Sequence, residues 1–159
     1  MKERDFLRKA VKAGQLGIVK PSENIFQSYL TKSDNCIRAA ELLIANGLYE
    51  NSISDSYYAI YNSLTALLRK VGIKCENHAV SISLLETLFS ETVLKDLANK
   101  AKDARIESQY EVDVLESKAK AAELQSQAEN FVSEIRLIAR RLTSEKSEKI
   151  RQELDKLIT

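Results

Sequence analysis

The stretch SISDSYYAIYNSLTALLRKVG, residues 52–72, decides the fold. Its large apolar residues recur in steps of three and four, the spacing of one face of an α-helix. They are Ile53, Tyr57, Ile60, Leu64, Leu67 and Val71. We therefore expect a helix from Ser52 to Val71 that is the most buried in the protein. Asn51 or Ser52 should cap its start, and Gly72 should end it.

A polar stripe with the same helical spacing runs beside this apolar face. Its members are Asp55, Tyr58, Asn62, Thr65 and Arg69. Globular helices are usually amphipathic, so the stripe is explained by a face in contact with water. A face that lines a cleft or meets a partner is the alternative, and the spacing alone leaves both interpretations open.

The composition indicates a single all-α domain. The chain has 159 residues, of which 44% are hydrophobic and 30% charged, with one Pro and four Gly. Its net charge of +1 provides no global field that would attract nucleic acid or an anionic membrane. No apolar run approaches the ~20 residues that span a bilayer, and the charged start MKERDFLRKAVKAG does not resemble a signal peptide. We expect a cytoplasmic protein.

Further helices are expected on both sides of the central one. Ser22 should cap a helix that stops at Asn46-Gly47, and Asn77 should cap another that Ser90 or Glu91 ends, after a loop at 73–76. The short turn at 48–51 makes the first two core helices antiparallel neighbours. The predicted fold is an up-and-down bundle of four to five core helices. We divide the chain into a basic N-terminal helix or arm (1–20), the bundle (21–142) and an amphipathic C-terminal helix (143–159).

The last long helix is expected to start between Ala104 and Val114. An apolar and small-residue heptad follows that point for four repeats. It comprises Val114, Ser117, Ala121, Leu124, Ala128, Phe131, Ile135, Ile138 and Leu142.

Few residues could carry chemistry. His78 is the single histidine, and Cys36 and Cys75 have no metal-ligand spacing, so we predict no metal site. The four glycines are scattered and form no phosphate-binding loop, and no pair of carboxylates stands out as an acid/base couple. We predict no catalytic residue and no cofactor.

Several short motifs resemble the HEPN family, a group of helical-bundle domains of prokaryotes and higher eukaryotes. These motifs are Gly47-Leu48-Tyr49 at a helix end, Tyr57-Tyr58-Ala59 within the next helix, His78 after a short loop, and Arg105 with Tyr110 five residues on. The resemblance covers about residues 22–140. Within the family, the chain is most similar in its motifs to the small stand-alone archaeal and bacterial members.

This resemblance implies an antiparallel bundle that pairs as a homodimer, often with a separate minimal nucleotidyltransferase, in some cases as toxin and antitoxin. Active HEPN toxins are metal-independent ribonucleases whose motif is Arg, four to six residues, then His. Here Tyr110 stands where that His would be, and Gln109 replaces a frequent Asp. A tyrosine, with a pKa of about 10, is a poorer general base at pH 7 than a histidine near 6.5.

The resemblance and the residues together favour a binding module with a cleft that takes a nucleotide, RNA or the nucleotidyltransferase. Six residues are the candidates to line it: Tyr58, Asn62, Arg69, His78, Arg105 and Tyr110. One alternative is a divergent ribonuclease in which His78 and Arg105 converge across a dimer. Another is a purely structural helical dimer, and Arg105 would then pair with a carboxylate such as Asp103, Glu107 or Asp55.

Overall fold

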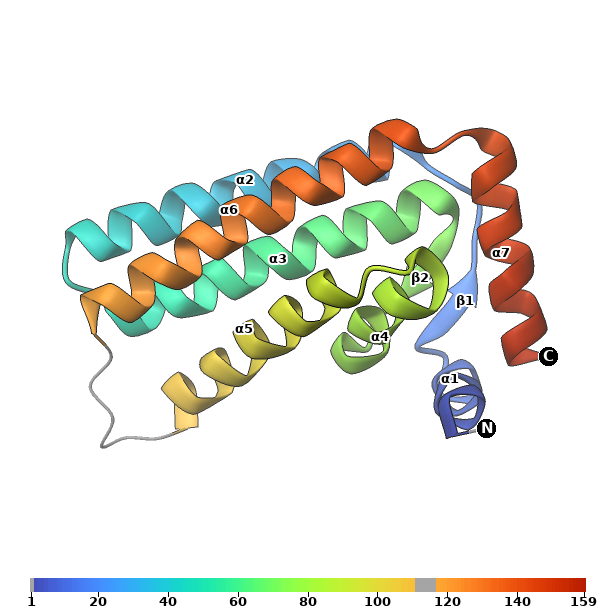
Figure 1. The fold of residues 1–159 in the computed structure, drawn as a ribbon, viewed down its shortest axis with the longest axis horizontal. Helices are drawn as coiled ribbons and strands as arrows, with labels where there is room; N and C mark the ends of the chain where they lie inside the picture. Colours follow the sequence, from blue (N-terminus) through green and yellow to red (C-terminus); the bar gives the residue numbers. More distant parts are fainter. Residues whose placement is uncertain (1, 111–116) are drawn as a thin grey trace.

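The computed structural model describes residues 2–110 and 117–159, which form an antiparallel helical bundle with one small sheet (Figure 1). The elements in chain order are α1 (Lys2–Lys12), β1 (Leu16–Ile18), α2 (Glu23–Ala45), α3 (Tyr49–Val71), β2 (Ile73–Cys75), α4 (His78–Phe89), α5 (Thr92–Tyr110), α6 (Lys118–Arg141) and α7 (Ser144–Ile158). The predicted all-α bundle with additional terminal helices is confirmed.

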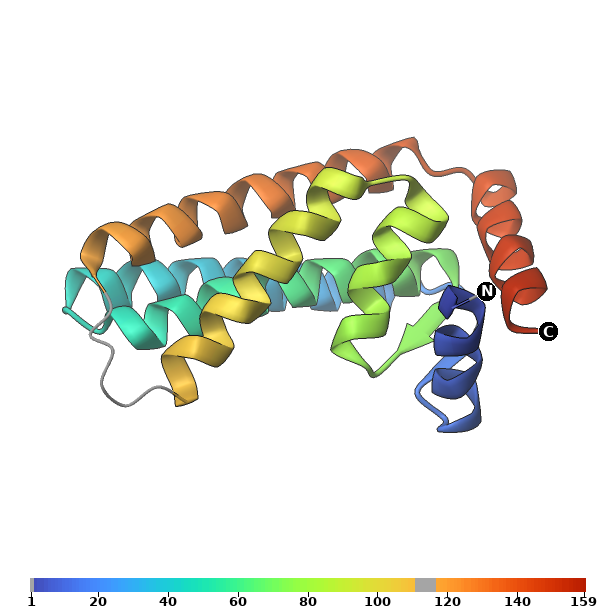
Figure 2. The ribbon, with the colours of Figure 1, turned by 60° about the horizontal axis from the view of Figure 1, so that its bottom comes forward.

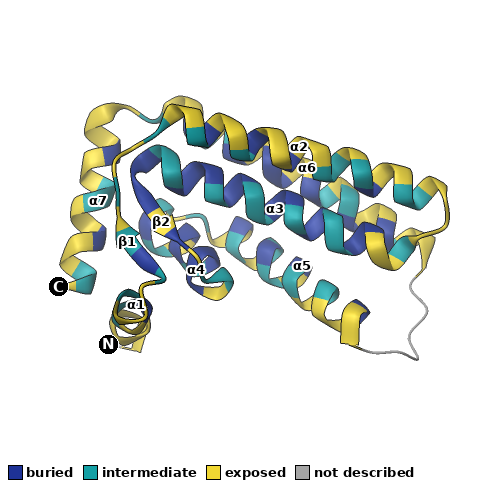
Figure 3. Cartoon of the chain, turned by 180° about the vertical axis from the view of Figure 1, so that it is seen from behind, coloured by how far each residue is buried: buried dark blue, intermediate teal, exposed yellow. Residues whose placement is uncertain are grey.

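Helix α3 is the centre of the bundle. It packs against α2, α5 and α6, which surround it on several sides (Figures 1 and 2). All six residues of the predicted apolar stripe are at most 1% exposed. Helix α3 has more buried residues than any other described helix, and its ribbon in Figure 3 is mostly dark blue and teal. The prediction that this helix is the most buried is therefore confirmed.

Most of the predicted helix ends are confirmed. Ser22 caps α2 by accepting a hydrogen bond from the Ile25 amide, and Asn77 caps α4 in the same way. Gly72 ends α3 with a left-handed backbone, φ +92°, and Ser90 ends α4.

The predicted start of α3 is wrong by one turn. The helix begins at Tyr49, and its cap residue Leu48 contributes no side-chain hydrogen bond. The hydroxyl of Ser52 is fully buried and donates to the carbonyl oxygen of Ala40 at 2.9 Å, so it joins α3 to α2 instead of capping a helix.

The expected loop at 73–76 contains a strand that the sequence did not indicate. Ile73–Cys75 pairs antiparallel with Leu16–Ile18, with Gly17 opposite Lys74. Strands of three residues are too short for an alternating pattern to stand out. This two-stranded sheet ties the segment before α2 to the segment that leads into α4.

The predicted start of the last long helix is also wrong. Ala104 lies inside α5, which continues to Tyr110, and α6 begins at Lys118 with Ser117 as its cap. The heptad is buried within α6 at Ala121, Leu124, Ala128, Phe131 and Ile135. The expectation for Val114 lies outside the described residues.

The two terminal helices pack at the end of the bundle where α3 finishes (Figure 1). Arg151 of α7 donates to the carbonyl oxygen of Val71 at 2.8 Å, and Arg4 of α1 donates to that of Lys156 at 2.7 Å. Leu7 of α1 and Leu154 of α7 are fully buried. Within the described parts of the chain, no helix is both long and apolar enough to cross a membrane.

Candidate functional site

Three tyrosines of α3 and the first residue of α4 form one aromatic cluster. Tyr57, Tyr58 and Tyr61 lie close together because residues three and four apart are neighbours on a helix. Strand β2 and the Asn77 cap place His78 beside them. The His78 ring stacks on Tyr61 with 3.7 Å between ring centroids, and its centroid lies 5.7 Å from that of Tyr57 and 6.5 Å from that of Tyr58.

A short hydrogen bond joins His78 to Tyr57 and indicates which nitrogen of His78 carries the proton. Nδ1 lies 2.6 Å from the hydroxyl oxygen of Tyr57, a side chain that is fully buried. Burial raises the pKa of Tyr57, so its hydroxyl keeps its proton and needs an acceptor. His78 Nδ1 is the acceptor that the described residues provide, which assigns the proton of the neutral imidazole to Nε2.

The imidazole of His78 is held in its neutral form. Burial lowers the pKa of His78 below its ordinary value, and the positive charges of Arg105 and Lys102 lower it further. At neutral pH, His78 therefore presents an Nε2–H donor and has no free lone pair with which to accept a proton.

Arg105 extends this cluster from α5. Its guanidinium carbon lies 5.0 Å from the ring centroid of Tyr57 and 5.6 Å from that of Tyr58, within cation–π range. One terminal nitrogen donates to the side-chain oxygen of Gln109 at 3.0 Å, and the buried Nε has no hydrogen-bond partner among the described residues.

The charge of Arg105 is not neutralised by an ion pair within residues 2–110 and 117–159. Glu107, one of the carboxylates expected to pair with it, lies 3.9 Å from Lys120 instead. The partner that Arg105 does have, Gln109, is an uncharged amide. The guanidinium thus keeps its full positive charge beside a neutral histidine.

The pKa of His78 can be measured directly because the chain has one histidine. We expect an NMR titration of its imidazole to show a midpoint below about 6.5, its ordinary value. Since the unfolded chain then binds the proton at a higher pH than the folded chain, stability should fall as the pH drops below about 6.5. Arg105→Gln should raise the midpoint only in part, because burial is the larger cause. A midpoint at or above that of the chain unfolded in urea would contradict the assigned environment.

The family is shown by a match to known proteins. The HEPN domain model matches residues 26–142, more than half of the chain. The chain belongs to the HEPN family. A curated protein of Methanocaldococcus jannaschii, named "Putative toxin MJ0605", is 26% identical over 92 residues, which cover 55% of this chain and 69% of that protein. The aromatic cluster and Arg105 lie within the part that the HEPN domain model matches.

The HEPN bundle brings three of the six candidate residues together and places the other three elsewhere. Tyr58, His78 and Arg105 share the aromatic cluster. Asn62 lies against α2, where its amide nitrogen is 3.7 Å from the sulfur of Cys36. Arg69 lines a groove of about 280 Å³ with four residues of α2, and Tyr110 is 76% exposed at the end of α5.

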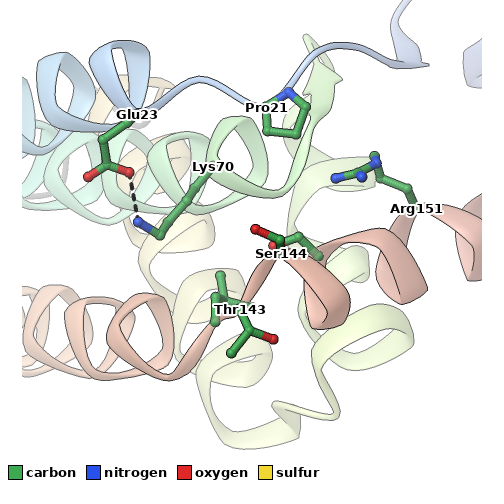
Figure 4. Close-up of a pocket in the computed structure, with 8 residues that line it drawn as sticks. Pro21, Glu23, Lys70, Thr143, Ser144 and Arg151 are labelled. Atoms are coloured by element: carbon green, nitrogen blue, oxygen red, sulfur yellow. Dashed lines mark hydrogen bonds and ion pairs between the residues drawn. The ribbon is translucent and has the colours of Figure 1, made fainter.

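A separate cavity of about 430 Å³ lies where α7 meets the bundle (Figure 4). The figure shows Lys70 pointing toward Glu23, with which it forms an ion pair at 2.8 Å. Arg151 is bound to the carbonyl oxygen of Val71. Both cations of this cavity are already engaged within the chain, so we place the candidate site at the aromatic cluster.

The sequence indicated the helix face of the cluster but missed Tyr61 and the role of Tyr57. Tyr61 is four residues after Tyr57, so helical spacing could have identified it. Tyr57 was predicted to be a core residue, and it is, but its hydroxyl also orients His78. In the described residues, no group of three or more His, Cys, Asp or Glu side chains is arranged to hold a metal ion.

Proposed function

We propose that this HEPN protein is a homodimeric binding module of a toxin–antitoxin type system, and that it takes an anionic ligand at the aromatic cluster. The ligand class is a nucleotide or RNA phosphate. The observation that carries the proposal is the Arg105 guanidinium, which lies over Tyr57 and Tyr58 and has no carboxylate partner among the described residues. Phosphate would supply the charge-assisted hydrogen bonds that this arginine lacks.

The cluster is composed of donors and stacking faces. Arg105 has donors and no acceptor, and the neutral His78 offers Nε2–H once Tyr57 occupies Nδ1. The half-buried Tyr58 ring adds a face on which a base could stack. These groups suit the recognition of a phosphate and an adjoining base better than the removal of a proton.

A ribonuclease is the second candidate, because one observation favours it. His78 and Arg105 were expected to meet only across a dimer, but both contact Tyr57 within one chain. Against catalysis, a general base needs a free lone pair, and the hydrogen bond from Tyr57 occupies that of Nδ1. Tyr110, which stands where the toxins have histidine, is 76% exposed.

The proposed partner is a minimal nucleotidyltransferase. Two observations support a toxin–antitoxin setting: the resemblance to the stand-alone HEPN proteins and the name of the related Methanocaldococcus jannaschii protein. A structural dimer without a small ligand is the remaining alternative. Co-purification from the native host would identify the protein partner.

Arg105→Ala tests the ligand site. Calorimetric titration with ATP and with a labelled single-stranded RNA should show binding to the parent that the variant weakens by roughly ten- to a hundredfold. Hydrogen bonds to charged groups contribute about 1.5–3 kcal/mol, which corresponds to that range. Arg105→Lys should recover only part of the affinity, because the planar donor fork is lost.

Arg140→Ala is the matched control, since it removes one exposed positive charge in the last turn of α6. It should leave binding nearly unchanged. Arg105→Ala binding as tightly as the parent while melting at a lower temperature would assign Arg105 a structural role. RNA recovered intact in the presence of a chelator supports the binding module. RNA cleavage that His78→Ala abolishes would establish the ribonuclease instead.

A further inference from the structure

The polar stripe of α3 has a symmetric arrangement of charge. Asn62 lies seven residues after Asp55 and seven residues before Arg69. A spacing of seven keeps side chains on one seam of a helix, and at 1.5 Å per residue each charged end lies about 10 Å from Asn62 along the axis. All five members of the stripe are partly exposed, so they are neither buried in the core nor fully exposed to water.

The two charged ends of the stripe have no ion-pair partner among the residues that the structure describes. Across the described ranges, 2–110 and 117–159, neither Asp55 nor Arg69 forms a salt bridge. The Nε atom of Arg69 is buried and has no hydrogen-bond partner within the described part of the chain. Burial is the one cause that shifts the pKa of Asp55 upward, as expected for a partly covered carboxylate with no cation beside it.

Arg69 and Asp55 cannot satisfy each other within one helix, because about 21 Å of helix axis separates them. A twofold axis through Asn62 brings Asp55 of one protomer close to Arg69 of the other. It places a second α3 antiparallel to the first, so that each Asp55 meets the partner's Arg69. In a twofold interface the same patch faces itself and every contact occurs twice.

We propose that a second copy of this chain docks on the polar stripe of α3, with Asn62 at the twofold axis and two Asp55–Arg69 ion pairs between the protomers. The proposal rests on the homodimer in the proposed function and is independent of the ligand. A polar Asn on such a seam favours one register over shifted ones.

Helix α2 supplies a border for this interface that is apolar in part and also carries Ser28 and Lys32. It lies along the stripe, since Ile25 and Tyr29 line the groove at Arg69, and Cys36 contacts Asn62. Helical spacing continues this border to Ala39 and Leu43, which are likewise partly exposed. The complementary charges would fix the register of this interface, and the neighbouring apolar surface would add contact area.

This docking would also place the candidate site next to the interface. Tyr58 belongs both to the stripe and to the aromatic cluster under Arg105. Because it lies four residues before Asn62, a twofold axis brings it near the partner's Thr65, three residues after Asn62. The two ligand sites of a dimer would then flank the seam.

Charge reversal at the two ends of the stripe tests the pairing by sedimentation velocity at micromolar concentration. Asp55→Arg and Arg69→Asp should each weaken self-association by roughly tenfold or more, because each places like charges together twice. The double variant should dimerise as the parent does. An equimolar mixture of the two single variants should form a heterodimer, in which both pairs again have opposite charges. Glu153→Arg, an exposed charge reversal on α7, is the control.

Melting curves by circular dichroism verify that each variant is folded. Single variants that dimerise as tightly as the parent would overturn this interface and leave the homodimer standing. Weakened single variants that neither the double change nor the mixture rescues would also overturn the pairing. A parent protein that stays monomeric on concentrating would overturn both this inference and the proposed homodimer, while ATP titration would still report on the ligand site.

Discussion

Leu64→Ala is expected to lower the free energy of unfolding by about 2–5 kcal/mol, the range for a large-to-small change in a core. Leu64 is 0% exposed in the middle of α3. Because α2, α5 and α6 all pack on this helix, the surrounding residues have little freedom to fill the cavity that the lost side chain would leave. Denaturant titration of the parent and the variant measures the difference.

Leu42→Ala is the matched control for this prediction. Leu42 is a leucine of α2 that is 63% exposed, so the same chemical change should alter stability by about half a kcal/mol or less. If Leu64→Ala lost no more than that, the centre of the core would have to lie elsewhere than along α3.

Hydrophobic periodicity was sufficient to predict the bundle. The six-residue stripe of α3 and the heptad of α6 are local patterns; the stripe is buried throughout, and the heptad is buried from Ala121 to Ile135. Helix ends were predictable where one side chain or glycine does the capping, as at Ser22, Asn77 and Gly72. The start of α3 was not, because Ser52 forms a tertiary hydrogen bond that a sequence does not reveal.

The contacts of the site that lie within one helix were predictable from the sequence, and those between helices were not. Tyr57 and Tyr58 are consecutive residues of one helix, so the sequence alone places them together. That His78 and Arg105 join them depends on how α4 and α5 cross α3, and only the family resemblance suggested it. The hydrogen bond that assigns the His78 tautomer depends on a tertiary distance of 2.6 Å, which no motif encodes.

The tautomer matters for function because it turns a potential base into a donor. A HEPN ribonuclease needs a group that takes a proton, whereas this cluster combines a cation with an N–H donor. The experiment with Arg105→Ala and the NMR titration of His78 therefore both test whether the cluster provides a cation beside a neutral histidine. The parent should both bind the ligand and show a lowered pKa of His78, whereas loss of the Arg105 charge should weaken binding and raise that pKa in part.

Gly72→Ala is expected to destabilise the protein by roughly 2–5 kcal/mol. Gly72 has φ +92°, a conformation that costs a residue with a side chain about 1–2 kcal/mol. A Cβ there would also lie 2.6 Å from the carbonyl oxygen of Val19 and 2.9 Å from Cδ of Arg151. Overpacking of this kind adds about 1–3 kcal/mol. Thermal and denaturant unfolding would measure the sum.

Gly47→Ala separates the two causes. Gly47 also has a positive φ, +75°, but nothing lies within 4 Å of its would-be Cβ, so only the backbone strain of about 1–2 kcal/mol should remain. Equal losses at the two glycines would show that the contact with Val19 has no cost.

Gly72 also directly precedes β2, which leads to His78. Gly72→Ala should therefore shift the NMR signals of His78, and Gly47→Ala should not, because the strand positions the histidine of the candidate site.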